Sequence, residues 1–230
     1  MKYNTLLFDL DGTLLDFHAA QKDAFFESFT HFGIDADDAM LIRYDEHNKA
    51  MWSMLERGEI TRDELFARRF KLFFESEGIW GIEPADMQKQ YMQSLSAGHS
   101  LMQGAAELLE KLIGKYKLCA ITNGFKLTQL RRLKDSGLDK IFDHVVISGD
   151  IGFEKPDPNY FEKAKEICEI DDIKTALVIG DSLNADIFGG GSFGFDTCWF
   201  NPENKPFSGT FAPTYIINEL SQLISLLDAD

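Results

Sequence analysis

Beyond residue 100 the sequence alternates short, continuous apolar runs with longer amphipathic segments, and this alternation restricts the fold more than any other feature. A continuous apolar run of this length predicts a strand that is covered on both faces. Strands that alternate with helices are typical of a parallel, doubly wound α/β sheet. The predicted strands are 5–9, 116–122, 144–148, 175–180, 196–200 and 214–217, and the predicted helices are 104–115, 127–137, 158–170 and 219–227.

The block between the first two predicted strands has a different pattern, with helical spacing and no convincing strand. Its clearest segment begins with a capping-box pattern at Thr61 and Glu64, and the apolar side chains that follow recur on one helix face. We therefore expect a small all-helical bundle inserted after the first strand of the α/β sheet. The predicted domain ranges are 1–16 with 97–230 for the α/β core and 17–96 for the helical insert.

Charge and cysteine content restrict the partners and the compartment. The formal net charge of −15 disfavours binding to nucleic acid and to anionic membranes. An anionic substrate would therefore need local positive groups or a bound cation.

Three widely spaced cysteines, Cys119, Cys168 and Cys198, form no metal or redox motif and favour a reducing compartment. No leader pattern and no apolar run of ~18 residues is found, so we expect a cytoplasmic protein without membrane spans.

Polar side chains follow four of the predicted strands at the point where each strand ends. They are Asp9, Asp11 and Thr13 after the first strand, Thr122 and Asn123 after the second, where Gly124 comes next, Asp150 and Lys155 after the third, and Asp181, Ser182 and Asp186 after the fourth. Ligands of open α/β sheets bind beyond the carboxyl ends of the strands, so these groups are expected to meet at one edge.

This set of groups fits phosphoryl transfer with Mg²⁺. The ion takes oxygen ligands and is usually held by one or two carboxylates together with substrate phosphate. Asp9 and Asp181 could supply the carboxylates, and the cation would offset the repulsion between Asp9 and Asp11. Thr122, Asn123 and Lys155 could hold the remaining phosphate oxygens.

Two other motif interpretations fail on their own requirements. A calcium loop that begins at Asp9 needs glycine and glutamate where this chain has Leu14 and Ala20. The glycines of 189–194 match a dinucleotide-binding pattern, but they do not directly follow a strand. These glycines are better explained by close packing of a helix against the sheet. Asp16 and Asp150 are better explained as residues that form a turn or cap a helix.

Four stretches in order, FDLDGTL, ITNG, EKPDP and VIGDSLNAD, resemble the four motifs of the haloacid dehalogenase (HAD) superfamily. The resemblance spans nearly the whole chain, and the helical insert after the first motif resembles the C1 cap domain of that family. ITNGFKLTQLRRLKDSGL and GDSLNADIFGGGSFGFDTCWFNP are most similar to the branch of YjjG-like pyrimidine 5′-nucleotidases. The resemblance implies a Rossmannoid HAD core with an all-helical cap domain.

The resemblance also implies the role of each site residue. Asp9 would be the nucleophile that forms an aspartyl-phosphate, and Asp11 would be the general acid and then the base. Lys155 would balance the charge of Asp9. Mg²⁺ would be held by Asp9, the backbone carbonyl of Asp11, Asp181 and Asp186. The phosphate would be bound by Thr122, Asn123, Gly124 and Lys155.

The function implied is Mg²⁺-dependent hydrolysis of small soluble phosphomonoesters, first of all nucleoside 5′-monophosphates. A sugar-phosphate phosphatase, such as an N-acylneuraminate-9-phosphatase, and a mutase resembling β-phosphoglucomutase are alternatives, because the same motifs serve them. A non-catalytic nucleotide-binding module is disfavoured, since Asp9, Asp11, Thr122, Lys155 and Asp181 are all present. Most aromatic side chains of the cap are expected in its core. The chain is expected to be a monomer or a homodimer.

Overall fold

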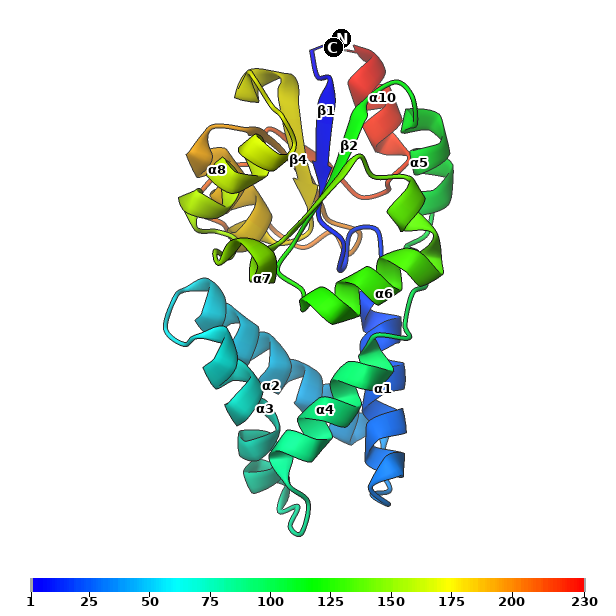
Figure 1. Cartoon of the computed structure of the whole chain (residues 1–230), viewed down its shortest axis with the longest axis vertical. Helices are drawn as coiled ribbons and strands as arrows, with labels where there is room; N and C mark the ends of the chain where they lie inside the picture. Colours follow the sequence, from blue (N-terminus) through cyan, green and yellow to red (C-terminus); the bar gives the residue numbers. More distant parts are fainter. Residues whose placement is uncertain (1, 230) are drawn as a thin grey trace. The chain divides into compact units, whose positions relative to one another are not determined.

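The computed structural model describes residues 2–229. The chain divides into two compact units, one made of Met1–Phe17 with His99–Asp230 and the other of His18–Gly98. The first unit contains a six-stranded parallel sheet in the order β3-β2-β1-β4-β5-β6, and Figure 1 shows β1 between β2 and β4. Its strands are β1 (Thr5–Phe8), β2 (Lys117–Thr122), β3 (His144–Ile147), β4 (Ala176–Gly180), β5 (Asp196–Phe200) and β6 (Tyr215–Ile217).

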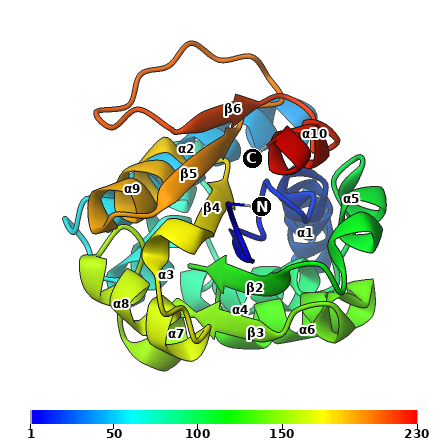
Figure 2. The ribbon, with the colours of Figure 1, turned by 90° about the horizontal axis from the view of Figure 1, so that it is seen from above.

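Helices cover both faces of this sheet. On one face α5 (Ala105–Leu112), α6 (Lys126–Ser136) and α10 (Gln222–Ala229) pack on strand residues such as Leu6 and Phe8. On the other face α8 (Pro158–Ile167) packs on residues that include Leu7 and Val178. Figure 2 shows α5 and α10 on one side of the row of strands and α8 and α9 (Gly189–Phe193) on the other. The predicted doubly wound parallel sheet is confirmed.

The register of the central strand positions the site. Phe8, the last residue of β1, is paired with Ala120 of β2 and with Ile179 of β4. The residue after each of these strands therefore emerges at the same edge, and the amide of Asp9 still donates to the carbonyl of Ile179 at 2.8 Å. Because β1 lies between β2 and β4, Asp9 is flanked by the ends of both strands.

Short helical elements that the sequence pattern did not predict follow β3 and β4. α7 (Ser148–Ile151) comes directly after β3, and a π-helical turn (Leu183–Phe188) precedes α9. A Cβ atom on Gly190 would lie 3.1 Å from Cγ2 of Val178 on β4, which agrees with close packing of the glycine-rich helix on the sheet. The remaining one-turn elements are the 3-10 helices Leu138–Lys140 and Ile173–Thr175.

The second unit is all helical over its described residues. It contains α1 (Phe17–His31, whose first residue belongs to the other unit), α2 (Asp38–Glu56), α3 (Arg62–Glu77) and α4 (Pro84–Leu95). Its core is aromatic, and Tyr44 stacks on Phe70 with ring centroids 5.4 Å apart. The buried aromatic side chains of this unit are Phe25, Phe29, Tyr44, Phe70, Phe73, Phe74 and Tyr91. None of the helices over residues 2–229 is both long and apolar enough to cross a bilayer.

The capping box predicted for α3 is present and gives a stability prediction. The amide of Glu64 donates to Oγ1 of Thr61 at 3.2 Å, and the amide of Thr61 donates to Oε2 of Glu64 at 2.9 Å. Thr61→Ala removes the acceptor for the first bond, so we expect a loss of about 1 kcal/mol in the free energy of unfolding. Urea denaturation would measure it, with Thr61→Ser as the control that keeps the hydroxyl group. Equal midpoints for all three proteins would contradict the prediction.

Candidate active site at the carboxyl ends of the strands

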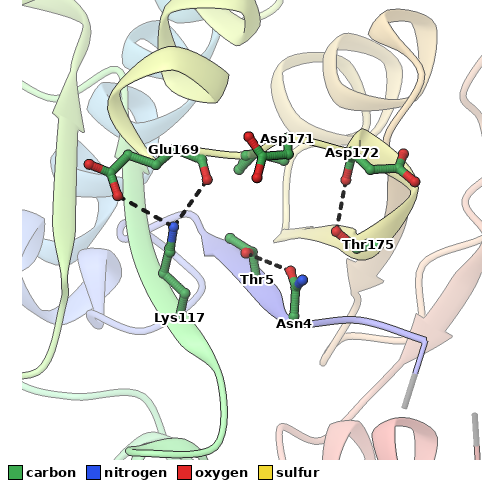
Figure 3. A pocket seen from close by; sticks show the side chains of 8 residues that line it. Asn4, Thr5, Lys117, Glu169, Asp171, Asp172 and Thr175 are labelled. Atoms are coloured by element: carbon green, nitrogen blue, oxygen red, sulfur yellow. Dashed lines mark hydrogen bonds and ion pairs between the residues drawn. The ribbon is translucent and has the colours of Figure 1, made fainter.

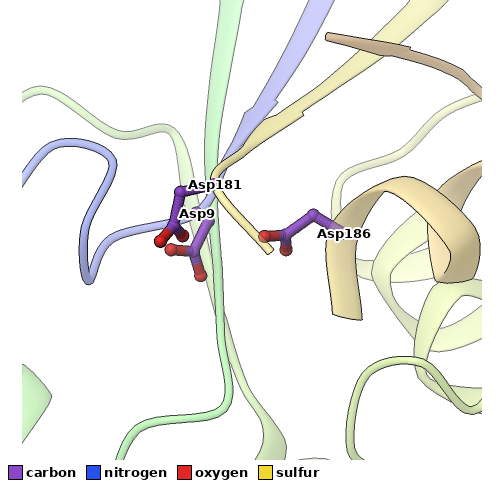
Figure 4. Close-up of side chains that lie close together, drawn as sticks. All are labelled: Asp9, Asp181 and Asp186. Atoms are coloured by element: carbon purple, nitrogen blue, oxygen red, sulfur yellow. The ribbon is translucent and has the colours of Figure 1, made fainter. Parts of the chain in front are cut away.

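Three carboxylates converge beyond the ends of β1 and β4. Asp9 follows β1, Asp181 follows β4, and Asp186 lies on the π-helical turn. One oxygen of each lies within 4.8 Å of the others, and Figure 4 shows the Asp9 and Asp181 side chains next to each other with Asp186 facing them. Asp9 and Asp186 are buried, whereas Asp181 keeps an exposed face. Residues that are 172 positions apart in the chain therefore share one site.

The backbone around these carboxylates is adapted to their close approach. Gly12 has φ +83°, and a Cβ atom there would lie 2.6 Å from Oδ2 of Asp181. A side chain at this turn would therefore be strained and would also collide with the carboxylate. A Cβ atom on Gly180, the last residue of β4, would likewise collide with the side chain of Asp186. The backbone carbonyl of Asp181 is held by a hydrogen bond from Nε1 of Trp199 on β5 at 2.9 Å.

Lys155 is the cation of this cluster. Its Nζ atom donates to Oδ1 of Asp9 at 2.6 Å, to Oδ1 of Asp186 at 2.7 Å and to the carbonyl of Ile121 at 3.2 Å. The side chain is only 2% exposed. Burial by itself lowers the pKa of Lys155, but the charges of Asp186 and Asp9 outweigh this effect and raise the pKa well above its usual value. The buried ammonium group is therefore charged and fully paired.

The loop that carries Lys155 is fixed by Asn123. The Asn123 side chain donates to the carbonyl of Lys155 at 2.8 Å and accepts from its amide at 2.9 Å. The amide of the next residue, Gly124, donates to Oγ1 of Thr122 at 2.9 Å. In this structure the Asn123 side chain thus positions Lys155, while its predicted contact with phosphate remains a prediction.

The charge balance of the cluster fits a divalent cation. Burial raises the pKa of Asp9 well above its usual value, the charges of Asp186 and Asp181 add to this, and Lys155 opposes it. Although Asp181 is exposed on one side, desolvation of its carboxyl group together with the charge of Asp186 raises its pKa to about 7. If all three carboxylates are ionised, the one ammonium group leaves two negative charges uncompensated, which agrees with the raised pKa values of Asp9 and Asp181. Mg²⁺ supplies that charge and accepts oxygen ligands, so the donor set suits it.

Two buried polar residues that the sequence analysis did not select contact Asp11. Gln129 donates to Oδ2 of Asp11 at 2.6 Å, and Arg132 forms an ion pair with Oδ1. Both lie on α6 and are at most 1% exposed. The sequence carries no local signal for their burial, because the leucines on the opposite helix face, Leu127 and Leu130, are the exposed ones.

Two further residues that follow strands, Asp150 and Ser182, lie outside the carboxylate cluster. Asp150 lies in α7 and forms an exposed ion pair with Lys126 at 2.6 Å. Ser182 caps the π-helical turn by accepting from the amide of Ala185 at 3.0 Å. All three cysteines are buried and form no disulfide bond.

A separate pocket lies at the opposite edge of the sheet, where the strands begin (Figure 3). Its volume is about 390 Å³, and its lining includes Thr5, the first residue of β1. Nζ of Lys117 is held there by the backbone carbonyls of Cys168 and Glu169 at 3.0 and 3.1 Å. Since Asp9 lies at the other end of β1, this pocket belongs to a different part of the unit from the carboxylate cluster.

Comparison with known proteins decides the family. The model of the haloacid dehalogenase-like hydrolases matches residues 3–194. The chain belongs to this family. An HAD-hydrolase named YfnB from Bacillus subtilis is 38% identical over 229 residues, which cover 100% of this chain and 97% of that protein. A solved structure of YfnB, bound to magnesium, matches this HAD hydrolase with a TM-score of 0.94 and covers 99% of this chain and 100% of the other.

Two further relatives of this HAD hydrolase carry a named activity. Pyrimidine 5′-nucleotidase PynA from Streptococcus pneumoniae is 38% identical and covers 99% of this chain and 96% of that protein. Pyrimidine 5′-nucleotidase YjjG from Escherichia coli is 32% identical and covers 99% of both. The predicted membership in the HAD family, its similarity to the YjjG-like branch and the prediction of an enzyme are confirmed.

Proposed function

We propose that this HAD hydrolase is a Mg²⁺-dependent phosphatase of small phosphomonoesters and that its substrates are pyrimidine nucleoside 5′-monophosphates. The observation that carries the proposal is the arrangement around Asp9, a buried carboxylate next to Lys155 and within 4.8 Å of Asp181. The two full-length relatives named as pyrimidine 5′-nucleotidases support the phosphomonoester chemistry and the choice of substrate.

In the proposed mechanism, Asp9 attacks the phosphorus atom and forms an aspartyl-phosphate. The bond from phosphorus to the leaving oxygen breaks, and Asp11, which must be protonated in the substrate complex, transfers its proton to that oxygen. Asp11 then takes a proton from the water that attacks the aspartyl-phosphate. The bond to Asp9 breaks, and free phosphate leaves. Lys155 holds the Asp9 carboxylate in place and balances its charge through both steps.

The phosphate and the cation would be bound by neighbouring groups. Asp9, Asp181 and the backbone carbonyl of Asp11 would hold Mg²⁺, which neutralises phosphoryl oxygens and so stabilises developing negative charge. Asp186 accepts from Nζ of Lys155 at 2.7 Å and from the amide of Ser182 at 3.1 Å, so its contribution to the cation would be through its charge or through a ligand water. The hydroxyl group of Thr122 would donate to a phosphate oxygen.

We also propose that the helical unit His18–Gly98 is the cap domain expected for the family. The boundaries of this unit differ by one or two residues from the predicted insert of 17–96. A cytoplasmic location and a monomeric or dimeric state remain predictions.

A substrate screen tests the proposed function. Phosphate release from pyrimidine and purine nucleoside 5′-monophosphates and from sugar phosphates would be measured at equal concentrations with added Mg²⁺. We expect the highest kcat/KM for the pyrimidine nucleotides. A higher kcat/KM for a sugar phosphate would favour the alternative phosphatase. Recovery of an isomer that retains its phosphate would favour a mutase.

Removal of divalent metal should abolish the activity. EDTA is expected to lower phosphate release from 4-nitrophenyl phosphate and from a pyrimidine nucleotide to background, because two charges of the carboxylate cluster then stay uncompensated. Excess Mg²⁺ should restore the activity, and EDTA saturated with Mg²⁺ is the matched control. Turnover that continues after extensive chelation would contradict the metal assignment.

A further inference from the structure

We infer that Gln129 and Arg132 of α6 are positioning residues that fix the carboxyl group of Asp11 and the hydroxyl group of Thr122 in their working arrangement. The inference rests on the proposed phosphatase function and extends it to two residues outside the four family motifs. All four residues belong to the α/β unit, and Gln129 and Arg132 are buried in it.

The side-chain amide of Gln129 connects the two groups directly. Its Nε2 atom donates to Oδ2 of Asp11 at 2.6 Å and to Oγ1 of Thr122 at 2.9 Å. Gln129 has no exposed surface, so water does not compete for these bonds. One amide group thus sets the distance between the proposed acid–base residue and the proposed phosphate-binding hydroxyl group.

Arg132 fixes the orientation of that amide group. Its Nη1 atom donates to Oε1 of Gln129 at 3.1 Å and also to Oδ1 of Asp11. The oxygen of Gln129 therefore faces a donor and its nitrogen faces the Asp11 carboxylate, so a flipped amide would lose its bonds to Arg132 and Asp11. Gln129 and Arg132 are three positions apart on one helix face, which lets both reach the same carboxylate. Both oxygens of Asp11 are held, one by each residue.

The same network determines what Thr122 can do. Its Oγ1 atom already accepts from the amide of Gly124 at 2.9 Å and from Gln129 at 2.9 Å. A hydroxyl group has two acceptor lone pairs and one donor hydrogen, so the hydrogen is left for an acceptor. Phosphate oxygens are acceptors. The network therefore orients Thr122 as a donor toward an anion.

Leaving-group dependence separates this positioning role from a purely structural one. A nucleoside 5′-alkoxide needs the proton of Asp11 as the bond from phosphorus to oxygen breaks, whereas 4-nitrophenolate leaves without one. Arg132→Met should therefore lower kcat/KM for a pyrimidine nucleotide by about 10²-fold and kcat/KM for 4-nitrophenyl phosphate by only a few fold. Gln129→Met should give the same unequal loss together with a loss common to both substrates, because Thr122 also loses its bond to Gln129. This variant keeps the ion pair between Asp11 and Arg132 if the arginine variant does not fold.

Two controls complete the experiment. Arg131 is the matched control, because it lies next to Arg132 but pairs with Asp135 at the surface at 3.3 Å. Arg131→Met should leave both kcat/KM values unchanged. In an Asp11→Asn background, Gln129→Met should no longer change the ratio of the two kcat/KM values, since a residue that acts through Asp11 has no effect on this ratio once the acid is gone.

The outcomes separate this inference from the proposed function. A loss that is equal on both substrates in both variants, or no loss in either variant, would overturn the positioning role while leaving the phosphatase function in place. A wild-type protein that releases phosphate from neither substrate would overturn the proposed function and this inference with it. An unequal loss that persists unchanged in the Asp11→Asn background would assign the effect to another acid and overturn the inference alone.

Discussion

Asp9→Asn is expected to lower kcat at least about 10⁴-fold, because an amide group does not replace a carboxylate as the attacking nucleophile. The fold should be retained. Asp9 is buried, but its replacement removes one of three crowded carboxylates, and Lys155 keeps Asp186 as a charged partner at 2.7 Å. Phosphate release and the thermal unfolding midpoint, measured on the same preparation, would test both parts of the prediction.

Asp150→Asn is the matched control for this prediction. Asp150 also follows a strand, yet it pairs with Lys126 at the surface and lies outside the carboxylate cluster. Its replacement should leave kcat within a factor of two or so, as expected for a surface position. Substantial turnover by Asp9→Asn would remove Asp9 from the role of nucleophile, and an equal loss in both variants would point to a non-specific cause.

Lys155→Met is expected to lower the free energy of unfolding by about 3–5 kcal/mol in the absence of divalent cations, because it leaves buried carboxylates without their cation. For a chain of this size the midpoint of thermal unfolding should fall by about 10 °C. Added Mg²⁺ should recover part of the loss, since the proposed metal site exists only in the folded protein and the ion would neutralise the same charges. Activity should remain very low even with Mg²⁺, because Asp9 loses the ammonium group that holds it at 2.6 Å.

Lys163→Met is the control for the stability measurement. Lys163 pairs with Glu166 at 2.6 Å on the surface, and both side chains are about half exposed. Surface ion pairs contribute little, so the variant should unfold within about 0.5 kcal/mol of the wild type. If Lys155→Met were as stable as this control without Mg²⁺, the buried ion pairs of Lys155 would have no net effect on stability.

Much of the fold could be predicted from local patterns. Residues 175–180 form a continuous apolar run, and β4 occupies Ala176–Gly180. Thr61 and Glu64 predicted the start of α3, and the structure contains both bonds of the capping box. These features are local, because a strand that is covered on both faces and a helix start depend mainly on neighbouring residues. By contrast, the predicted helix at 219–227 begins only at Gln222, because a helical pattern without a capping box predicts the existence of a helix better than its first residue.

The site was predictable only in part. Asp9, Asp181 and Lys155 stood out because each follows an apolar run and matches a family motif. Gln129 and Arg132 did not, because a polar residue in an amphipathic helix usually faces solvent. Their burial depends on a partner 118 and 121 positions away in the sequence, the carboxylate of Asp11. For the same reason the pairing between Asn123 and the backbone of Lys155 had no local signal.

By itself, the sequence determined the kinds of element, their order along the chain and the carboxylates that follow the first and fourth strands. Only the tertiary structure decided which elements are neighbours. It placed β1 between β2 and β4, so that Asp9 and Asp181 approach each other, and it turned one face of α6 toward Asp11. The physical reason is that the type of an element follows from the periodicity of side chains within a short stretch of sequence. Which elements lie next to each other follows from burial and strand pairing across the whole unit.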